Sequence, residues 1–174
     1  MSGAPLVRPA CPDDAAAIAG ICTRAARAAY ADLVTDDYLT RVIDHFFAID
    51  RLVQEVAPGP GWFGFTVAEE GAHVLAVAGT GASAEHAGAC ELFALYVDPA
   101  AQRRGLGRVL VASAVSASSR AGASRLDVAV MPGNEPARRF YQACGFIFAG
   151  QRPVYAPHGP EGGPQMAAVY ARQL

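Results

Sequence analysis

The chain has 174 residues, of which 52% are hydrophobic and 17% charged, and its formal net charge is -2. A chain of this size can bury a core within one domain, and the composition is typical of a folded protein rather than a disordered one. The small negative charge argues against nucleic-acid binding, which usually requires a basic surface. We therefore expect a single domain over residues 1–174 with no nucleic-acid partner.

Membrane and metal sites are also not indicated by the sequence. No run approaches the roughly 18 to 20 uncharged apolar residues that span a bilayer, and the segment Met1 to Arg8 lacks a hydrophobic signal core. The histidines are scattered and form no cluster with cysteines of the kind that binds metal. We expect a cytoplasmic protein with no membrane partner and no metal.

The first half of the chain is predicted to hold two helical regions and then a hairpin. Asp13 or Asp14 can cap the first helix, and Thr35 or Asp36 begins the second. Two segments rich in strand-forming residues are joined by Glu69–Ala72, which is typical of an antiparallel hairpin. The expected elements are a strand at 6–8, a helix from about 14 to 30, a helical region that starts near 35 and breaks at the loop 58–61, and strands at 62–68 and 74–80.

The second half alternates strands and helices. Residues 91–97 are apolar on both faces after Glu91, as expected for a strand inside a sheet. The next strand is reached through a helix, so these two strands should pair in parallel by a right-handed crossover. The elements expected after 91–97 are a helix at 105–120, a strand at 126–130, a helix at 135–143, and strands at 146–154 and 166–171. The predicted fold class is α+β with α/β character in this half.

A glycine-containing segment lies between the buried strand and the helix that follows it. Gln102-Arg103-Arg104-Gly105-Leu106-Gly107 comes where the unpaired N–H groups of a first helical turn point outward together, an arrangement that suits a pyrophosphate. Glycines here permit a ligand to approach closely, and Arg103, Arg104 and Arg108 add positive charge. The segment is neither the G-x-G-x-x-G dinucleotide motif nor a P-loop, because the third glycine and the lysine are missing.

The segment resembles the [QR]-x-x-G-x-[GA] motif of the GNAT superfamily of acyl-CoA N-acyltransferases. Members follow this motif with a strand, an asparagine, a helix that carries a tyrosine, and a Gly-Phe step. Val128–Val130, Asn134, Tyr141 and Gly145-Phe146 occur here in that order. The resemblance is strong from Glu91 to Phe148, whereas the N-terminal half agrees only in its order of elements.

The resemblance implies a GNAT fold with acetyl-CoA as the cofactor. The expected sheet is mixed but mostly antiparallel, has six to seven strands flanked by about four helices, and is splayed between the fourth and fifth strands. Pantetheine would pair with the backbone of Leu95 and Val97 beside Tyr96, and a bulge near Ala94 or Leu95 would leave an N–H for the thioester oxygen. The predicted cofactor-binding residues are Leu95, Tyr96, Val97, Gln102, Arg103, Arg104, Gly105, Leu106, Gly107, Arg108 and Asn134.

Two residues are candidates for catalysis. The family uses a tyrosine such as Tyr141 to protonate the CoA sulfur, although a core aromatic paired with Phe140 is the alternative. Asn134 lies seven residues earlier, on the same helix face, and can bind cofactor, cap the helix, or do both. Glu91 occupies the position of the general base in histone-acetylating members, and burial would raise its pKa. Its alternative is a solvated glutamate at the end of a strand.

The acceptor is less well specified than the donor. Tyr30, Asp32, Asp36, Asp37 and Tyr38, together with residues 155–164, are the candidates, and acidic and aromatic groups there would suit a cationic amine. The leading hypothesis is an N-acetyltransferase that acts by direct transfer in a ternary complex on a small-molecule or peptide amine, with a homodimer possible. A catalytically silent acyl-CoA-binding module and a nucleotide-binding regulatory domain are the alternatives.

Overall fold

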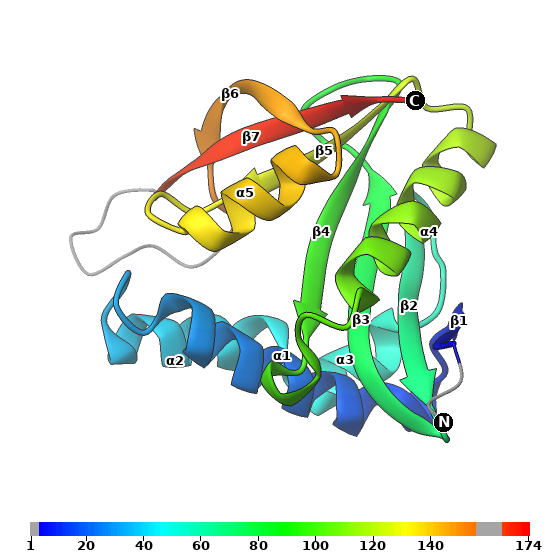
Figure 1. Ribbon diagram of the computed structural model, residues 1–174, viewed down its shortest axis with the longest axis vertical. Coiled ribbons are helices and arrows are strands. Elements are labelled where there is room, and N and C mark those ends of the chain that lie inside the picture. Colours follow the sequence, from blue (N-terminus) through cyan, green and yellow to red (C-terminus); the bar gives the residue numbers. More distant parts are fainter. Residues whose placement is uncertain (1–3, 156–164) are drawn as a thin grey trace.

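The computed structural model, which describes residues 4–155 and 165–174, contains one seven-stranded sheet in the order β1-β2-β3-β4-β5-β7-β6 (Figure 1). All pairs of neighbouring strands are antiparallel except β4 and β5, which are parallel. The expected mixed, mostly antiparallel sheet is therefore confirmed. The strands are β1 (Leu6–Pro9), β2 (Trp62–Glu70), β3 (His73–Ala82), β4 (Ala89–Val97), β5 (Arg125–Val130), β6 (Ile147–Pro153) and β7 (Met166–Gln173).

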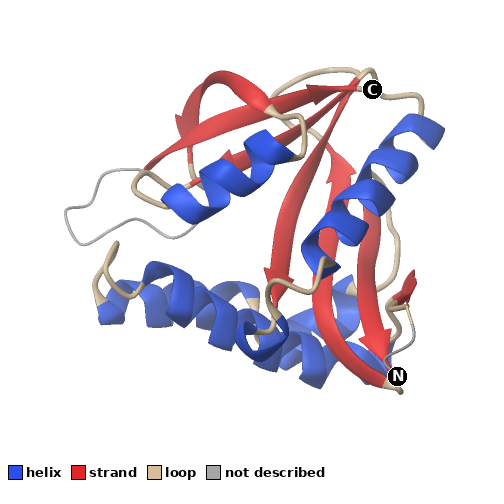
Figure 2. Ribbon diagram, in the orientation of Figure 1, coloured by secondary structure: helices blue, strands red, loops and turns tan. Residues whose placement is uncertain are grey.

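Helices cover both faces of the sheet (Figure 2). Side chains of the strands pack against both helix layers. Val67 and Val77 pack with α1 and α3 in one core cluster, whereas Ala68, Ala76 and Ala78 pack with α4 in another. This alternation is the period-two pattern of strands buried on both faces. The helices are α1 (Ala15–Tyr30), α2 (Asp36–Phe46), α3 (Ile49–Glu55), α4 (Leu106–Arg120) and α5 (Glu135–Ala143), with short 3-10 turns at Pro12–Asp14 and Pro99–Ala101.

The N-terminal half differs from expectation in two details. The described residues form five α-helices rather than about four, because α3 follows α2 after a break at Phe47. Leu52 of α3 is fully buried against α1, so tertiary packing stabilises this short helix. Asp14 precedes α1 but does not cap it with its side chain. Its carboxylate instead accepts from Arg8 and from the Cys11 N–H, which holds the pKa of Asp14 at about 2.

The hairpin between β2 and β3 is tighter than its sequence suggested. Glu70 pairs directly with His73, so the turn consists of Gly71 and Ala72 alone, and both have positive φ. Two left-handed central residues are the hallmark of a type I′ turn, which matches the twist of antiparallel strands. As a result, β2 and β3 extend beyond their predicted ends, and β3 pairs with β4 on its other side.

The parallel pairing of β4 and β5 is short. It runs from Ala89 opposite Arg125 to Leu92 opposite Val128, after which the two strands diverge. The remainder of β5, Ala129 and Val130, pairs only with β7 on its other side. The sheet is therefore splayed between its fourth and fifth strands, as expected, and the opening lies beside the N-terminus of α4 and the face of α5 (Figure 1).

Candidate active site

The turn from β4 into α4 lies beside the opening and contains two residues in the left-handed backbone conformation. Arg103 and Gly105 both have positive φ, of 62° and 82°, and no side chain caps the helix at Gly105. Left-handed residues in such a turn aim successive N–H groups into one concavity, and the helix N-terminus adds a partial positive charge. The turn can therefore bind an anionic group such as a pyrophosphate.

A cavity of about 650 Å³ begins at this turn and continues between β4 and β5. It reaches Tyr141 on α5 at its inner side. Gly107 lies at the wall, where an added Cβ would come within 3.1 Å of the Phe140 ring. The predicted cofactor residues that line this cavity are Leu95, Tyr96, Val97, Gln102, Arg103, Gly105, Leu106, Gly107, Arg108 and Asn134. Because these residues were predicted to bind the acyl donor, we refer to it as the donor cavity.

Arg104 is the one predicted cofactor residue that does not line the donor cavity. Its guanidinium forms an ion pair with Glu70, at the tip of the β2–β3 hairpin. The adjacent Arg103 and Arg108 both line the cavity. Alternate residues of the turn thus face opposite directions, and the charge of Arg104 serves the contact between the turn and the hairpin.

Helix α5 contributes Asn134 and Tyr141 to the donor cavity. The Oδ1 atom of Asn134 accepts from the Ala137 N–H at 3.2 Å, so this residue caps the helix. Burial raises the pKa of Tyr30, and the nearby Asn134 side chain partly offsets this increase. Tyr141 is 7% exposed, and burial raises the pKa of its phenol far above the ordinary value. Tyr141 therefore holds its proton firmly at neutral pH.

A β-bulge interrupts β4 beside the opening. Gly79 pairs with Ala94 but Thr80 pairs with Leu92, so Phe93 is the additional residue. The irregularity lies one residue before the predicted range of Ala94 or Leu95. A bulge leaves local backbone groups outside the regular ladder and redirects a side chain. Here it exposes Phe93, at 41%, although β4 lies in the middle of the sheet.

A second cavity, of about 630 Å³, lies between α2, α3 and the strand ends on the other side of the bulge. Aromatic rings dominate its wall. The two cavities share residues and therefore meet; the shared residues are Tyr30, Leu92, Phe93, Ala94, Tyr96 and Ala129. Because the wall of the second cavity includes Tyr30, Tyr38 and Tyr155, which were predicted for the acceptor side, we refer to it as the acceptor cavity.

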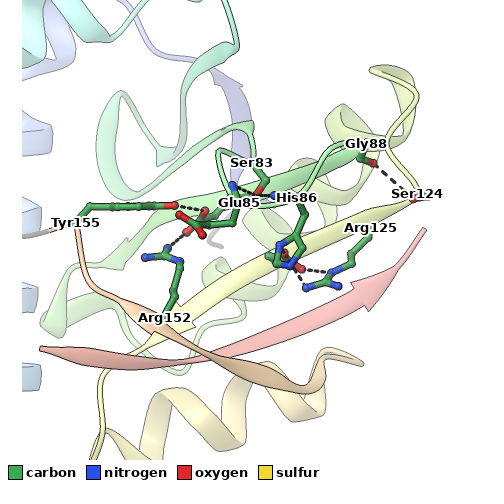
Figure 3. A network of polar contacts seen from close by, with 10 residues as sticks. Ser83, Glu85, His86, Gly88, Ser124, Arg125, Arg152 and Tyr155 are labelled. Carbon is green, nitrogen blue, oxygen red and sulfur yellow. Dashed lines mark hydrogen bonds and ion pairs between the residues drawn. The ribbon is translucent and has the colours of Figure 1, made fainter. Parts of the chain in front are cut away.

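Glu91 lies in the wall of the acceptor cavity and is almost fully buried, at 2% exposure. Its carboxylate is ion-paired with Arg152 of β6 and accepts from the Tyr155 hydroxyl at 3.4 Å (Figure 3). Burial raises the pKa of Glu91, and the positive charge of Arg152 opposes this increase. Glu91 is thus neither solvated nor at the end of its strand, since β4 already begins at Ala89.

Asp127 is a second buried carboxylate next to Glu91. The two residues are paired across β4 and β5. The Asp127 carboxylate contacts the guanidinium of Arg125 and lies 3.2 Å from Nδ1 of His86 (Figure 3). Two buried carboxylates therefore lie on neighbouring strands, each with its own cationic partner. Asp127 also raises the pKa of Glu91 through like-charge repulsion.

The residues predicted for the acceptor side separate into two groups. Tyr30 and Tyr38 line the acceptor cavity, but Asp32, Asp36 and Asp37 are not part of its wall. Asp36 instead forms an ion pair with Arg27 at the surface. Acidic residues at the start of α2 are explained by their favourable interaction with the helix N-terminus. Of residues 155–164, only Tyr155 lies within the described part, and it lines the cavity.

Sequence reasoning did not identify several residues of the acceptor cavity. Trp62, Phe93 and Arg152 come from β2, β4 and β6, and no fixed spacing connects them. The available signal was weak: Phe93 is a large apolar residue next to the predicted bulge, and Arg152 is a charge within a strand. Among the described residues, no group of histidine, cysteine and acidic side chains could hold a metal ion, and no helix is long and apolar enough to cross a bilayer.

The model of the acetyltransferase (GNAT) family matches residues 22–146. The chain belongs to this family. The matched range includes β4, α4, β5 and α5, and therefore the whole donor cavity and the bulge. Members are acyltransferases that use acetyl-CoA, so the expected family and cofactor are confirmed.

Solved structures of GNAT proteins share this fold. The PaiA N-acetyltransferase of Thermoplasma acidophilum, solved with coenzyme A, is 14% identical with a TM-score of 0.81 over 99% of this chain and 100% of its own. A GCN5-related N-acetyltransferase from Kribbella flavida is 26% identical, with a TM-score of 0.69 over 98% of both chains. YncA of Salmonella typhimurium, solved with acetyl-CoA, is 25% identical with a TM-score of 0.64 over 99% and 95% of the chains.

Proposed function

We propose that the protein is an N-acetyltransferase in which a primary amine attacks acetyl-CoA directly within a ternary complex. The observation that carries this proposal is the junction of the two cavities at Tyr30, Phe93 and Ala94. An acetyl group that arrives through one cavity and an amine that arrives through the other would meet there. Holding both reactants at one point removes much of the entropic barrier of a bimolecular reaction.

The donor cavity has the parts that acetyl-CoA requires. Its pyrophosphate would bind to the N–H groups of the turn that contains Arg103 and Gly105, with Arg108 beside them. The pantetheine arm would continue along the edge of β4 at Leu95–Val97, where β5 no longer pairs. Polar groups of that edge would otherwise face an open cavity, and the amides of pantetheine can satisfy them.

The acetyl carbonyl would lie next to the bulge at Phe93. Attack by the amine nitrogen forms a tetrahedral intermediate, whose oxyanion needs a hydrogen-bond donor in a site that excludes water. Backbone N–H groups freed from the ladder by the bulge supply such a donor. The intermediate then collapses, the carbon–sulfur bond breaks, and the products are an amide and CoA thiol.

Tyr141 is the proposed acid for the leaving thiolate. It lines the donor cavity, and its raised pKa keeps the hydroxyl protonated until a strong base develops nearby. The CoA sulfur becomes that base as the carbon–sulfur bond breaks, and the phenol regains its proton afterwards from solvent. A positioned acid of this kind typically contributes about 10²- to 10⁴-fold in rate.

Glu91 is the proposed base that removes the proton from the amine. It lies on the acceptor side, two residues before the bulge, and the Tyr155 hydroxyl contacts it at 3.4 Å. Transfer can occur directly or through one water molecule. Arg152 keeps the carboxylate ionised, and burial strengthens it as a proton acceptor.

Release of CoA thiol from acetyl-CoA in the presence of a panel of amines tests the proposal. We expect amine-dependent release, and we expect Tyr141→Phe to lower kcat by at least about 100-fold while CoA affinity barely changes. Tyr170→Phe is the matched control, because Tyr170 is a buried tyrosine that lines neither cavity, and it should retain activity. CoA binding without turnover of any amine would favour the silent acyl-CoA-binding module instead.

A further inference from the structure

We infer that the acceptor is a primary amine with an aromatic or similarly flat hydrophobic group and with no second charge. The inference rests on the proposed function and specifies its substrate class. It derives from two properties of the acceptor cavity: the arrangement of aromatic rings in the wall, and the pairing of the charges there.

One wall of the cavity is a row of aromatic side chains from three separate segments. The Trp62 ring centroid lies 6.0 Å from that of Phe93, which lies 6.2 Å from Tyr155. Gly79 makes room for this wall, because a Cβ there would come within 2.6 Å of the Trp62 ring. Elsewhere in the wall, Tyr96 packs edge-on against Phe47 at 5.3 Å. The rings thus bound a space that suits a flat apolar group.

Phe93 connects this wall to the reaction centre. It lines both cavities and remains 41% exposed, although it belongs to a central strand. The bulge places it there, since a regular strand would alternate its side chains into the two helix layers. An apolar surface that is exposed within a cavity gains free energy when an apolar ligand displaces its water.

The charged side chains of the cavity already have partners. Of the described residues in its wall, the arginines and glutamates form two pairs, Arg51 with Glu55 at 2.7 Å and Arg152 with Glu91. The guanidinium of Arg152 also lies 3.8 Å from the centre of the Tyr155 ring. The described wall therefore has no net charge.

This pairing selects against acceptors with a further charge. Among the wall residues that the structure describes, a second ammonium group would find no carboxylate without a cationic partner, and a carboxylate would have to separate an existing ion pair. The aspartates expected to attract a cationic chain, Asp32, Asp36 and Asp37, lie outside the wall. We therefore expect polyamines and free amino acids to be poor acceptors. An aromatic monoamine loses only the hydration of its single ammonium group, and it loses this at the junction of the cavities, where the amine must become neutral to react.

The first experiment compares kcat/KM for 2-phenylethylamine, ethylamine, spermidine and L-phenylalanine, measured as CoA release from acetyl-CoA. We expect 2-phenylethylamine to exceed each of the others by at least about tenfold, because even one methylene in an apolar pocket is worth roughly 10- to 200-fold. Ethylamine isolates the contribution of the ring, spermidine the second positive charge, and L-phenylalanine the carboxylate. Equal or higher values for spermidine or L-phenylalanine would overturn the inference.

The second experiment tests the ring of Phe93. Phe93→Ala should lower kcat/KM for 2-phenylethylamine by at least about tenfold while changing that for ethylamine much less, and Phe93→Leu should fall between the two. Phe148→Ala makes the same chemical change at an exposed site on β6, outside both cavities, and should behave as wild type. Equal losses for both amines in Phe93→Ala would contradict a role in selecting the aromatic group.

Binding of 2-phenylethylamine to the CoA-loaded protein, followed by calorimetry, separates the two proposals. If it binds more tightly than spermidine but no amine is acetylated, the proposed function fails and the selectivity of the cavity stands. If spermidine is acetylated efficiently and 2-phenylethylamine neither binds nor reacts, the function stands and the inferred substrate class is wrong. Calorimetry of Phe93→Ala with the same amine shows whether the wall itself is responsible.

Discussion

Glu91 shows how a single residue can have two roles. Its buried ion pair with Arg152 connects β4 to β6, and removal of one partner from such a pair is strongly destabilising. Glu91 also lines the acceptor cavity, where we propose that it takes the proton from the amine. A structural role and a catalytic role predict different responses to pH, and pH therefore distinguishes them.

Glu91→Gln should lower kcat/KM by about 100-fold near neutral pH, and the kcat/KM of this variant should approach that of wild type at high pH. Because burial raises the pKa of Glu91, the wild-type rate should fall as the pH decreases through a value above the ordinary glutamate pKa of about 4.3. The variant lacks this base, so its rate should depend on deprotonation of the amine by solvent, with a pKa near that of lysine, about 10.4. Rates measured from pH 5 to 10 check the prediction.

Glu85→Gln is the matched control, because Glu85 is an exposed carboxylate in the loop before β4 and should leave the profile unchanged. The melting temperature of each variant reports the structural contribution separately. If Glu91→Gln lowers the melting temperature but its pH profile coincides with that of wild type, Glu91 stabilises the fold and does not act as the base.

The partners of individual residues were the least predictable part of the site. Glu91 and Tyr141 were candidates from sequence because a motif gives their positions along the chain. Arg152 is 61 residues from Glu91, and only the return of β6 beside the sheet brings the two together. The aspartates of α2 are a separate case. Acidic residues are favoured both at the start of a helix and in a site for a cationic substrate, so their presence alone does not indicate a substrate site.

At the scale of elements, the turn between β4 and α4 depends on backbone conformation more than on side chains. Gly105 has φ of 82° and open space around the position of a Cβ, so substitution there strains the backbone without a steric clash. Gly122, which follows α4, has φ of 80° and equally open surroundings. The two glycines begin and end the same helix, but only Gly105 lines the donor cavity.

Gly105→Ala and Gly122→Ala should each destabilise the protein by about 1–2 kcal/mol, the usual cost of a left-handed alanine. Gly105→Ala alone should weaken CoA binding, because a change in φ there redirects the N–H groups of the turn. Thermal unfolding gives the stability of the two variants, and calorimetry gives their affinity for CoA. A similar loss of affinity in both variants would show that the effect is one of general stability.

Elements with their own local signal were predicted well. The β2–β3 hairpin, α4 and α5 have turn residues, helical spacing or a cap within the segment itself, and their ends agree with prediction to within a few residues. The separation of α3 from α2 was not predicted, because α3 has seven residues and no side-chain cap, and isolated helices of this length are unstable. Helix α3 forms because Leu52 and Val56 pack against α1, and no local pattern indicates that contact.

For the molecule as a whole, the donor cavity lies inside the sheet rather than at its edge. Strands β1 to β4 lie on one side of the cavity and β5 to β7 on the other. A ligand in this position contacts both parts, and the complete site exists only in the folded chain. The splay between the fourth and fifth strands was predicted from the family resemblance. The junction with a second cavity was not, because it depends on how α2 and α3 close over the strand ends.

Coenzyme A should therefore raise the melting temperature of the protein. Preferential binding to the folded state adds about 2.7 kcal/mol when the ligand is at 100 times its Kd. For a chain of this size, each kcal/mol raises the melting temperature by roughly 2–4 °C, so a total increase of about 5–10 °C is expected. Thermal scans with increasing CoA measure it. Adenosine, which lacks the pyrophosphate and pantetheine, should give little increase, and an equal effect would contradict binding at the turn.

The short ladder between Ala89–Leu92 and Arg125–Val128 has a mechanical consequence. Within the described residues, strand pairing joins β1–β4 to β5–β7 only along this ladder, so it can act as a hinge about which the two parts rotate. Such a hinge would widen or narrow the far end of the opening while the core on each side stays intact. A ligand that bridges the opening would act as a spacer and fix the angle, and with it the position of β4 relative to α5.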